Sequence, residues 1–325
     1  MSTLSLSRRI RILDLHPEKD TLKEEVLEGL GDSPKHLPCK LLYDERGSHL
    51  FNRICDLDEY YLTRTEMSIM EEYADEMVDR LGKRILLVEY GSGSSVKTRI
   101  LLDRLSEPVG YVPIDISRNH LVEAANSIAT AYPEVEVLPV CADYTQQIRL
   151  PQPAARASRV VVYFPGSTIG NFYPSDARSF LRRIAATCST GGGLLIGVDL
   201  RKGPQVLEAA YNDESGVTAD FNKNILRRIN REIGSEFDLD RFDHDAVYNA
   251  RHGRIEMYLV SRLDQRVRVD GRSIELRRGE RICTEHSYKY TLDGFAELAA
   301  SAGFAVREVW TDPLSYFSVQ YLQAE

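Results

Sequence analysis

The sequence predicts an α/β fold built on a mostly parallel sheet that ends in an antiparallel hairpin. Three observations predict it. Buried-strand patterns alternate with helical patterns from residue 84 to residue 200, a glycine turn joins the first of these strands to its helix, and a short turn joins the last two strand patterns. Parallel strands need a crossover connection, usually a helix, whereas a short turn can join only antiparallel strands.

Two helices are predicted before the sheet begins. Residues 20–31 place apolar side chains on one face and end at Gly31, and residues 65–82 carry an apolar face between Thr65 as N-cap and Gly82 as C-cap. The segment between these helices is aromatic and polar and has no clean period.

The sheet itself is predicted from five strand patterns and the helices between them. The strands cover residues 84–90, 111–117, 135–144, 159–171 and 191–200, and the helices cover residues 96–105, 120–132 and 174–188. Residues 201–286 break this rhythm with a helical segment and short strands. After them, Thr291 caps a helix over residues 292–303, and two final strands cover residues 304–312 and 317–324.

Composition argues against several classes of partner. The chain has 41 basic and 49 acidic residues, a net charge of −8 and no basic stripe interleaved with aromatic side chains, so we expect no nucleic-acid substrate. No apolar run approaches the roughly 20 residues that span a bilayer. The five scattered cysteines lack a C-x-x-C pair and indicate a reducing compartment. We therefore expect a cytoplasmic protein that does not bind a membrane.

No metal site is expected either. The seven histidines are scattered without ligand spacing. The acidic run DLDRFDHD at residues 238–245 lacks the loop glycine and the terminal glutamate of a calcium loop, so we expect a solvated surface segment there.

The glycine turn EYGSGSSVKTR at residues 89–99 predicts a nucleoside site. It is not a P-loop, because Val96 rather than glycine precedes Lys97, and Val96 also stands where the dinucleotide fingerprint needs its third glycine. Gly91 and Gly93 let the backbone approach a ligand closely, since glycine has no Cβ. The loop is therefore expected to hold an adenosine-like molecule that carries no phosphate.

Two acids at the ends of the next two strands favour the same ligand. Asp115 is positioned to accept both hydroxyls of a ribose, and Asp143 to accept from an adenine amino group while the Tyr144 ring packs on the base. An acid on the first strand suits a cationic nucleoside, for which S-adenosylmethionine is the obvious candidate. The alternatives are strand-end capping by the two aspartates and a nicotinamide dehydrogenase, which would normally keep the third glycine. Methyl transfer is favoured.

Longer motifs indicate a family. The stretches KLLYDERGSHLFNRICDLDEYYLTRTE, EYGSGSSVKTR, GSTIGN, AYNDESGVTADFNKN, RIEMYL and TEHS together resemble the L-histidine Nα-methyltransferases of the ergothioneine pathway over nearly the whole chain. The resemblance implies three methyl transfers from S-adenosylmethionine to the α-amine of L-histidine and its mono- and dimethylated forms. The products are hercynine and S-adenosyl-L-homocysteine.

The resemblance also implies a domain organisation. A class I methyltransferase (Rossmann-like) domain, which binds S-adenosylmethionine, is expected over residues 66–200 and 287–325. A discontinuous α+β substrate-binding domain is expected over residues 1–65 and 201–286, and the protein is expected to be a monomer.

Residues that match the family take their expected roles from it. Asn171 and Tyr211 match the pair that holds the substrate carboxylate, and Glu285 and Ser287 match the pair that reads the imidazole. A carboxylate pairs well with an imidazole N–H, and a hydroxyl can meet the other nitrogen as donor or acceptor. Strand alternation puts both side chains on one face, with His286 pointing away.

The remaining matches complete the substrate site and the cofactor site. The other substrate residues are Tyr43, Phe51 and Tyr60 around the amine, with Tyr43 and Tyr60 as catalytic candidates, and Gly166 and Met257. The cofactor residues are Gly91, Ser92, Gly93, Lys97, Asp115, Asp143 and Tyr144. The sequence departs from the family pattern at Tyr144, where another aromatic residue is common, and at Tyr90, where an aliphatic residue is usual. Ordinary packing is the alternative for any single tyrosine and for Met257, and a simple turn is the alternative for Asn171.

The chemistry requires a neutral amine. No His, Lys or Cys in the matched motifs is an evident general base, so we expect the cationic sulfonium and tyrosine hydroxyls to favour the neutral amine while water carries the proton away. Aromatic faces stabilise alkylated ammonium ions, which gives Tyr60 a reason to be aromatic. Two other functions stay open: an N-methyltransferase of the same scaffold that acts on another aromatic amino acid or derivative, and a non-catalytic module that senses S-adenosylmethionine.

Overall fold

The larger sheet follows the predicted α/β pattern. The computed structural model describes residues 10, 12–15, 19–93 and 95–325. Within them the strand order is β1-β6-β4-β3-β7-β8-β15-β14, and β5 pairs with β4. All these pairs are parallel except those of β15, which runs antiparallel to β8 and β14. The strands are β1 (Leu13–Asp14), β3 (Leu86–Tyr90), β4 (Gly110–Asp115), β5 (Glu136–Val137), β6 (Val140–Cys141), β7 (Val160–Phe164), β8 (Gly193–Asp199), β14 (Phe304–Thr311) and β15 (Phe317–Ala324).

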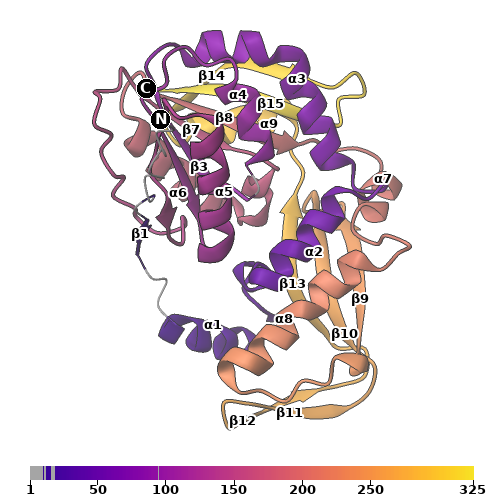
Figure 1. Cartoon of the computed structure of the whole chain (residues 1–325). Helices are drawn as coiled ribbons and strands as arrows, with labels where there is room; N and C mark the ends of the chain where they lie inside the picture. The colour runs from indigo at the N-terminus through magenta and orange to yellow at the C-terminus, as the bar shows by residue number, and fades with distance from the viewer. Residues whose placement is uncertain (1–9, 11, 16–18, 94) are drawn as a thin grey trace.

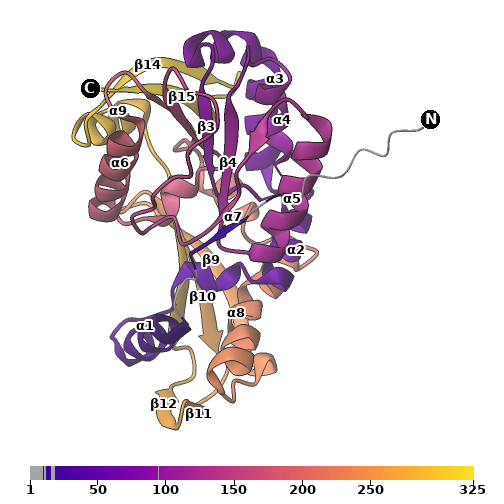
Figure 2. The same cartoon turned by 60° about the vertical axis from the view of Figure 1, so that its left-hand side comes forward.

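Helices cover both faces of this sheet (Figure 2). On one face lie α3 (Tyr61–Leu81), α4 (Val96–Leu102) and α5 (Arg118–Ala131), and on the other lie α6 (Pro174–Cys188) and α9 (Leu292–Ala300). The central strand β3 is buried along its whole length, as expected for a parallel strand covered on both faces. The prediction of an α/β sheet that ends in an antiparallel hairpin is confirmed.

A second, smaller layer lies below the larger sheet in the view of Figure 1. Its sheet has the order β2-β13-β10-β9, and α2 and α8 pack together over it. A two-stranded hairpin, β11 with β12, projects from its far end (Figure 1). The elements of this layer are α1 (Lys19–Gly31), β2 (Lys35–His36), η1 (Cys39–Leu42), α2 (Glu45–Cys55), α7 (Pro204–Ala209), α8 (Val217–Ile233), η3 (Leu239–Arg241), β9 (Phe242–Asn249), β10 (Arg254–Ser261), β11 (Gln265–Val269), β12 (Arg272–Leu276) and β13 (Arg281–Tyr288).

The two layers meet at the carboxyl ends of β7 and β8. The short helix η2 (Thr168–Asn171), which follows β7, packs on β13 of the smaller sheet. Asp199 at the end of β8 forms an ion pair with Lys289, the residue after β13 (2.7 Å). Since ligands of parallel sheets bind at the carboxyl ends of the strands, this junction is the expected place for a site.

The structure differs from the predicted boundaries at several elements. The predicted strand 159–171 ends with β7 at Phe164, and Thr168–Asn171 form η2. Helix α3 begins at Tyr61, so Thr65 lies inside the helix instead of capping it, while Gly82 does follow its end with φ +82°. The aromatic run that precedes Thr65 continues the apolar face by one turn, and Tyr61 and Leu62 are buried. The predicted strand 135–144 is split into β5 and β6, with Pro139, which lacks a backbone N–H, between them.

The acidic run at residues 238–245 lies at the surface, with the side chains of Asp238 and Asp243 51% and 54% exposed, but it is part of the smaller layer. This acidic run enters η3 and then the strand β9, whose Phe242 and Ala246 are buried against the core. The intervening acids pair with arginines from outside β9, Asp243 with Arg262, which follows β10 (2.7 Å), and Asp245 with Arg281 at the start of β13 (2.6 Å). Strand alternation therefore explains a charged sequence in an ordered sheet.

The predicted domain boundaries stay a prediction. Within the predicted substrate segment 1–65, residues 1–9, 11 and 16–18 lie outside the described residues, and β1 pairs with β6 of the larger sheet. The end of β13, which reaches Tyr288, pairs with β10 in the smaller sheet. In the part of the chain that the structure describes, no helix is both long and apolar enough to cross a membrane.

Candidate active site

Two adjoining cavities lie where the layers meet. We call outer cavity the one lined by the glycine turn and the start of α4, which has a volume of about 430 Å³ and so falls in the usual range of small-molecule sites. We call inner cavity the one enclosed by α2, η2, α8 and the inward face of β10 and β13. Both are lined by Phe51, Tyr60, Gly166 and Thr168. A molecule in one cavity can therefore reach a molecule in the other through this shared wall.

The glycine turn shapes one side of the outer cavity. Gly91 and Gly93 have positive φ (+73° and +47°), and a Cβ on Gly93 would meet nothing within 4 Å, so the backbone is open to a ligand there. The Gly93 N–H donates to Asp115 Oδ2 (3.1 Å), which fixes the turn against the end of β4. The buried Ser92 Oγ has no hydrogen-bond partner among the described residues. An unpartnered hydroxyl in this cavity fits a polar ligand such as S-adenosylmethionine.

Asp115 combines burial with backbone hydrogen bonds. Burial raises the pKa of its carboxyl, and the N–H groups of Ser117 and Gly93 counteract part of that rise. Three predicted cofactor residues, Asp115, Asp143 and Tyr144, do not line the outer cavity. Asp143 accepts from the Thr145 backbone (2.9 Å) and pairs with Lys40 (3.6 Å). Tyr144 stacks on Tyr90, with ring centroids 6.0 Å apart. Their contact with an adenine stays a prediction.

A buried glutamate that sequence reasoning missed links the two cavities. Glu66 of α3 is fully buried and pairs with the ammonium of Lys97, while both its carboxylate oxygens accept from the Gly166 N–H (3.0 and 2.9 Å). Lys97 lines the outer cavity and Gly166 lines both. The signal was present in the sequence, because Glu66 stands on the apolar face of α3, one turn before Met70.

The inner cavity brings together every predicted substrate residue. Its lining includes Tyr43, Phe51, Tyr60, Gly166, Asn171, Tyr211, Met257, Glu285 and Ser287. They come from segments that are up to 244 residues apart, between Tyr43 and Ser287. Their convergence in one cavity supports the predicted roles.

A bulge in β13 aims Glu285 and Ser287 inward. Met257 of β10 pairs with Glu285 and Tyr258 pairs with Cys283, so Thr284 is the extra residue and shifts the alternation. The His286 ring lies instead beside the ring of Tyr173, with centroids 4.9 Å apart. The prediction that Glu285 and Ser287 share a face turned away from His286 agrees with this geometry.

Glu285 is an unsatisfied carboxyl at the end of the inner cavity. Its side chain is 9% exposed, and Oε2 is buried without a hydrogen-bond partner among the described residues. Burial raises its pKa to about 7, although the nearby Lys289 acts to lower it. Since buried polar groups are normally hydrogen-bonded, this oxygen is suited to an N–H brought in by a ligand.

Ser287 and Tyr211 are joined to a buried lysine that sequence reasoning also missed. The Tyr211 hydroxyl donates to Ser287 Oγ (2.9 Å), and Lys289 Nζ donates to Ser287 Oγ (2.9 Å) and to Tyr211 Oη (3.0 Å). Lys289 is the next inward position after Glu285 and Ser287 in the two-residue period of the strand, and this period could have revealed it.

Aromatic rings line the cavity beside the shared wall. Phe51 contacts Tyr43 and Tyr60 edge-on, with ring centroids 5.6 and 6.2 Å apart, and Phe221 of α8, which was not predicted, lies 5.5 Å from Tyr43. Burial raises the pKa of Tyr43 and of Tyr60 above the usual value, so both hydroxyls keep their protons at neutral pH.

Comparison with known proteins agrees with this arrangement. A family model described as "Histidine-specific methyltransferase, SAM-dependent" matches residues 22–324. The chain belongs to this family. It is 40% identical to the histidine N-alpha-methyltransferase of Mycolicibacterium smegmatis, over 92% of this chain and 94% of that protein. It is 32% identical to the ergothioneine biosynthesis protein 1 of Neurospora crassa, over 86% of this chain and 32% of that protein. An N-methyltransferase of Aspergillus flavus is 26% identical, over 96% of this chain and 92% of that protein.

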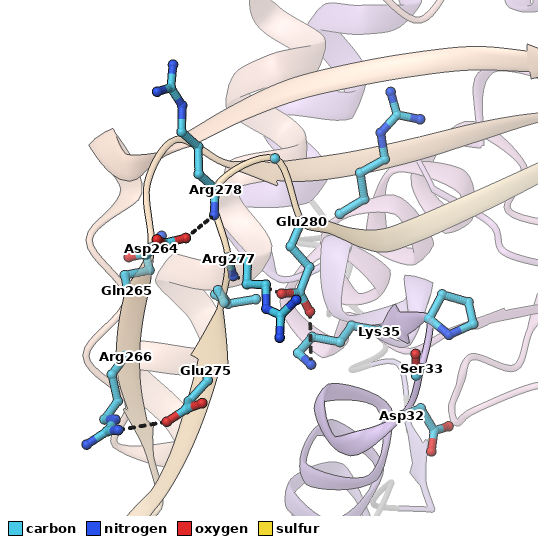
Figure 3. A pocket seen from close by; sticks show the side chains of 14 residues that line it. Asp32, Ser33, Lys35, Asp264, Gln265, Arg266, Glu275, Arg277, Arg278 and Glu280 are labelled. Atoms are coloured by element: carbon cyan, nitrogen blue, oxygen red, sulfur yellow. Dashed lines mark hydrogen bonds and ion pairs between the residues drawn. The ribbon is translucent and has the colours of Figure 1, made fainter.

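A separate groove on this methyltransferase has no part in the site. It lies between the β11–β12 hairpin and the segment before β2, and none of the predicted site residues lines it (Figure 3). Its charges are largely paired with one another, Lys35 with Glu280 (3.1 Å) and Arg266 with Glu275 (2.7 Å). Exposed pairs of this kind contribute little and leave no clear ligand chemistry in the groove.

Proposed function

We propose that this chain trimethylates the α-amino group of L-histidine with S-adenosylmethionine and gives hercynine, the first step of ergothioneine biosynthesis. The observation that carries the proposal is the unpartnered Glu285 carboxylate oxygen, beside Ser287, in a cavity that shares a wall with the cofactor cavity. A carboxylate and a hydroxyl match the two nitrogens of an imidazole. The family match and the histidine N-alpha-methyltransferase relatives support the same substrate.

The proposed orientation follows from the lining of the inner cavity. With the imidazole at Glu285 and Ser287, the amino-acid end of the substrate points toward Asn171, whose amide N–H can donate to its carboxylate. Tyr211 borders the same end of the cavity, with its own proton donated to Ser287 Oγ (2.9 Å). The amine then lies near Phe51, Tyr60 and Gly166, the wall shared with the outer cavity. When bound, S-adenosylmethionine supplies a methyl group on a sulfonium and becomes S-adenosylhomocysteine.

The proposed catalytic contribution of the chain is position and electrostatics. Holding the nitrogen, the methyl carbon and the sulfur in line, with the reacting atoms about 3–3.5 Å apart, removes much of the entropic barrier. Among the described residues that line the inner cavity, Glu285 is the only carboxylate, and its place at the imidazole end leaves the amine without a carboxylate base from that lining. Tyr43 and Tyr60 therefore orient the neutral amine, and water takes its proton.

The aromatic wall has a second role in the proposal. Each methyl transfer leaves a more substituted ammonium beside Tyr60 and Phe51, and aromatic faces attract such cations. Retention of the mono- and dimethylated forms follows from this attraction. All five cysteines are free thiols, which supports the proposal that the protein works in the cytoplasm.

The test is to incubate the protein with methyl-labelled S-adenosylmethionine and histidine, tyrosine or tryptophan, and to identify the products by mass spectrometry. We expect trimethylhistidine alone. Methylation of tyrosine or tryptophan with histidine untouched would transfer the proposal to the second function, an N-methyltransferase of another aromatic amino acid. Cofactor binding with no methylation of any of the three would leave the sensor as the better explanation.

A further inference from the structure

Lys289 is a fully buried cation behind the inner cavity. All three of its N–H donors are engaged, by Asp199 Oδ2 (2.7 Å), Ser287 Oγ (2.9 Å) and Tyr211 Oη (3.0 Å). Asp199 also accepts from the Tyr61 hydroxyl (2.8 Å) and from Lys202 (2.5 Å). This carboxylate therefore anchors the lysine and keeps two further partners of its own.

The hydrogen bonds around Lys289 decide which way the hydroxyl protons point. A lysine ammonium can only donate, and a serine hydroxyl has one proton and two acceptor sites. Ser287 Oγ accepts from Lys289 and from the Tyr211 hydroxyl (2.9 Å), so both of its acceptor sites are occupied. The proton of Ser287 is left over, and the side chain lines the inner cavity. Ser287 therefore faces a ligand as a donor.

We propose that Lys289 is a positioning residue that makes Ser287 a hydrogen-bond donor, so that the inner cavity accepts histidine with a neutral imidazole whose N–H faces Glu285 and whose unprotonated nitrogen faces Ser287. The proposal rests on the proposed function. An imidazolium has N–H groups at both nitrogens, and one of them would meet the Ser287 donor without an acceptor. An unpaired donor in a buried site is costly, and such sites discriminate strongly.

The pH dependence of this recognition is set by few groups. The titratable or charged groups that face the imidazole end of the cavity, or the groups that hold it, are Glu285, Lys289, Tyr211, Asp199, Lys202, Tyr61, Tyr43, Tyr60 and Cys39. Burial raises the pKa of the tyrosines and of Cys39, and the pKa of Lys289 is also raised, by Asp199 and Tyr211, so none of these titrates between pH 5 and 7.5. Within the pH range of the test, Glu285, with a pKa of about 7, Lys202, whose pKa burial lowers to about 8, and the substrate ring change their charge. Lys202 titrates with either substrate bound, so its effect cancels when two substrates are compared.

A comparison of two substrates isolates the ring. The kcat/KM of wild-type protein is measured from pH 5 to 8 for histidine and for 2-fluorohistidine, whose ring stays neutral throughout. Titration of Glu285 and of the amine affects both substrates and cancels in the ratio of the two kcat/KM values. We expect the histidine to 2-fluorohistidine ratio to fall about tenfold per pH unit below the ring pKa of about 6.5. A ratio that does not change with pH would overturn the proposal.

Two matched variants then test Lys289 itself. In Lys289→Met, Ser287 regains a free acceptor site, so we expect the ratio to lose most of its pH dependence and the KM for histidine at pH 8 to rise about tenfold. Lys202→Met is the control, because Lys202 shares Asp199 but contacts neither Ser287 nor Tyr211, and the wild-type dependence should remain. If the kcat/KM ratio of Lys289→Met changed with pH as it does in the wild type, Lys289 would not be the residue that makes Ser287 a donor.

A further variant covers the case in which Lys289→Met does not fold. Tyr211→Phe removes the proton that Ser287 accepts from Tyr211, and so also frees an acceptor site on Ser287. The kcat/KM ratio of this variant should therefore depend less on pH, as in Lys289→Met. Absence of histidine methylation at any pH would contradict the proposed function. If the wild type methylated histidine but its ratio of kcat/KM for histidine to that for 2-fluorohistidine did not change with pH, only this inference would be contradicted.

Discussion

At the scale of single residues, Glu285 combines specificity with a cost in stability. Its buried oxygen is available to an N–H because no residue that the structure describes satisfies it. Lys289 provides the nearby positive charge, but the ammonium donates to Asp199, Ser287 and Tyr211 and not to Glu285. The arrangement keeps one strong acceptor free for a ligand.

Replacement of Glu285 by Ala should impair histidine specifically. We expect kcat/KM for histidine to fall by an amount equivalent to about 2–5 kcal/mol, the usual cost of removing one side of a buried polar pair. The affinity for S-adenosylmethionine, measured by calorimetry, should change little. Glu275→Ala, which removes an exposed carboxylate of the hairpin, is the control. Unchanged histidine turnover in Glu285→Ala would show that the pocket is assigned wrongly.

Tyr60 allows the ring and the hydroxyl to be tested separately. Tyr60→Phe keeps the aromatic face, so the mono- and dimethylated intermediates should stay bound, while loss of the hydroxyl slows the first methyl transfer. Tyr60→Ala removes the face, and a cation–π loss of about 0.5–2 kcal/mol should release intermediates into solution. Mass spectrometry of products at early times gives the ratio of partly to fully methylated histidine. Equal ratios in the two variants would exclude a role for the aromatic face.

At the scale of elements, α3 connects the two cavities through one side chain. Glu66 holds Lys97 at the start of α4 and the Gly166 N–H after β7, so a single carboxylate sets the distance between three elements. The bulge in β13 has a comparable effect, because the extra residue Thr284 shifts the alternation and so turns the face that carries Glu285 and Ser287 inward. Small irregularities in regular elements thus decide where the polar groups of the site point.

Glu66→Gln should weaken both binding and stability. Removing one partner of a buried ion pair leaves the other uncompensated, which typically costs about 3–5 kcal/mol. We expect a lower Tm together with a higher KM for both S-adenosylmethionine and histidine, measured by thermal melts and initial rates. Glu71→Gln, an exposed position on the same helix, provides the comparison. A variant that loses stability but keeps both KM values would confine Glu66 to a structural role.

At the scale of the whole molecule, the site exists only because two layers meet. The larger sheet supplies the glycine turn, Asp115 and Gly166, and the smaller layer supplies Glu285, Ser287 and the aromatic wall. Neither layer encloses the inner cavity alone. Desolvation of Glu285 therefore lowers the free energy of unfolding of the complete protein.

This cost predicts a stability effect with a defined sign. The Glu285 pKa is raised from 4.5 to about 7, so the folded protein holds the proton more tightly than the unfolded chain. Below about pH 4.5 both states are protonated and no penalty exists. The penalty grows as pH rises from 4.5 to 7 and is complete above about 7, where it amounts to roughly 3 kcal/mol.

Glu285→Gln should consequently stabilise the ligand-free protein at pH 8 more than at pH 5. Chemical unfolding of variant and wild type at the two pH values gives the difference in the free energy of unfolding, and effects of other titrating groups such as Glu89 cancel in that difference. An equal effect at both pH values would show that the carboxyl is not desolvated. Histidine methylation should be lost at the same time, so stability and activity move in opposite directions.

The sequence by itself determined most of the fold and many of the site residues. The two periodicities, 3.6 and 2, gave the helices and strands of the larger sheet, and the absence of a third glycine distinguished the nucleoside turn from phosphate-binding loops. The resemblance to the L-histidine Nα-methyltransferases also gave Glu285, Ser287 and Tyr60, because each lies in a short stretch that matches the family.

Only the tertiary structure decided the contacts that hold these residues in place. Glu66 and Gly166 are 100 residues apart and Tyr211 and Lys289 are 78 apart, and no local pattern specifies such pairs. The sequence did not reveal the strand β9, because its acids find arginine partners elsewhere in the smaller layer, at Arg262 and Arg281. Long-range burial and pairing change what a charged side chain does, and these depend on which elements pack together. That is why the partners of Glu66 and Lys289 became visible only in the folded molecule, although the position of each residue had a signal in the sequence.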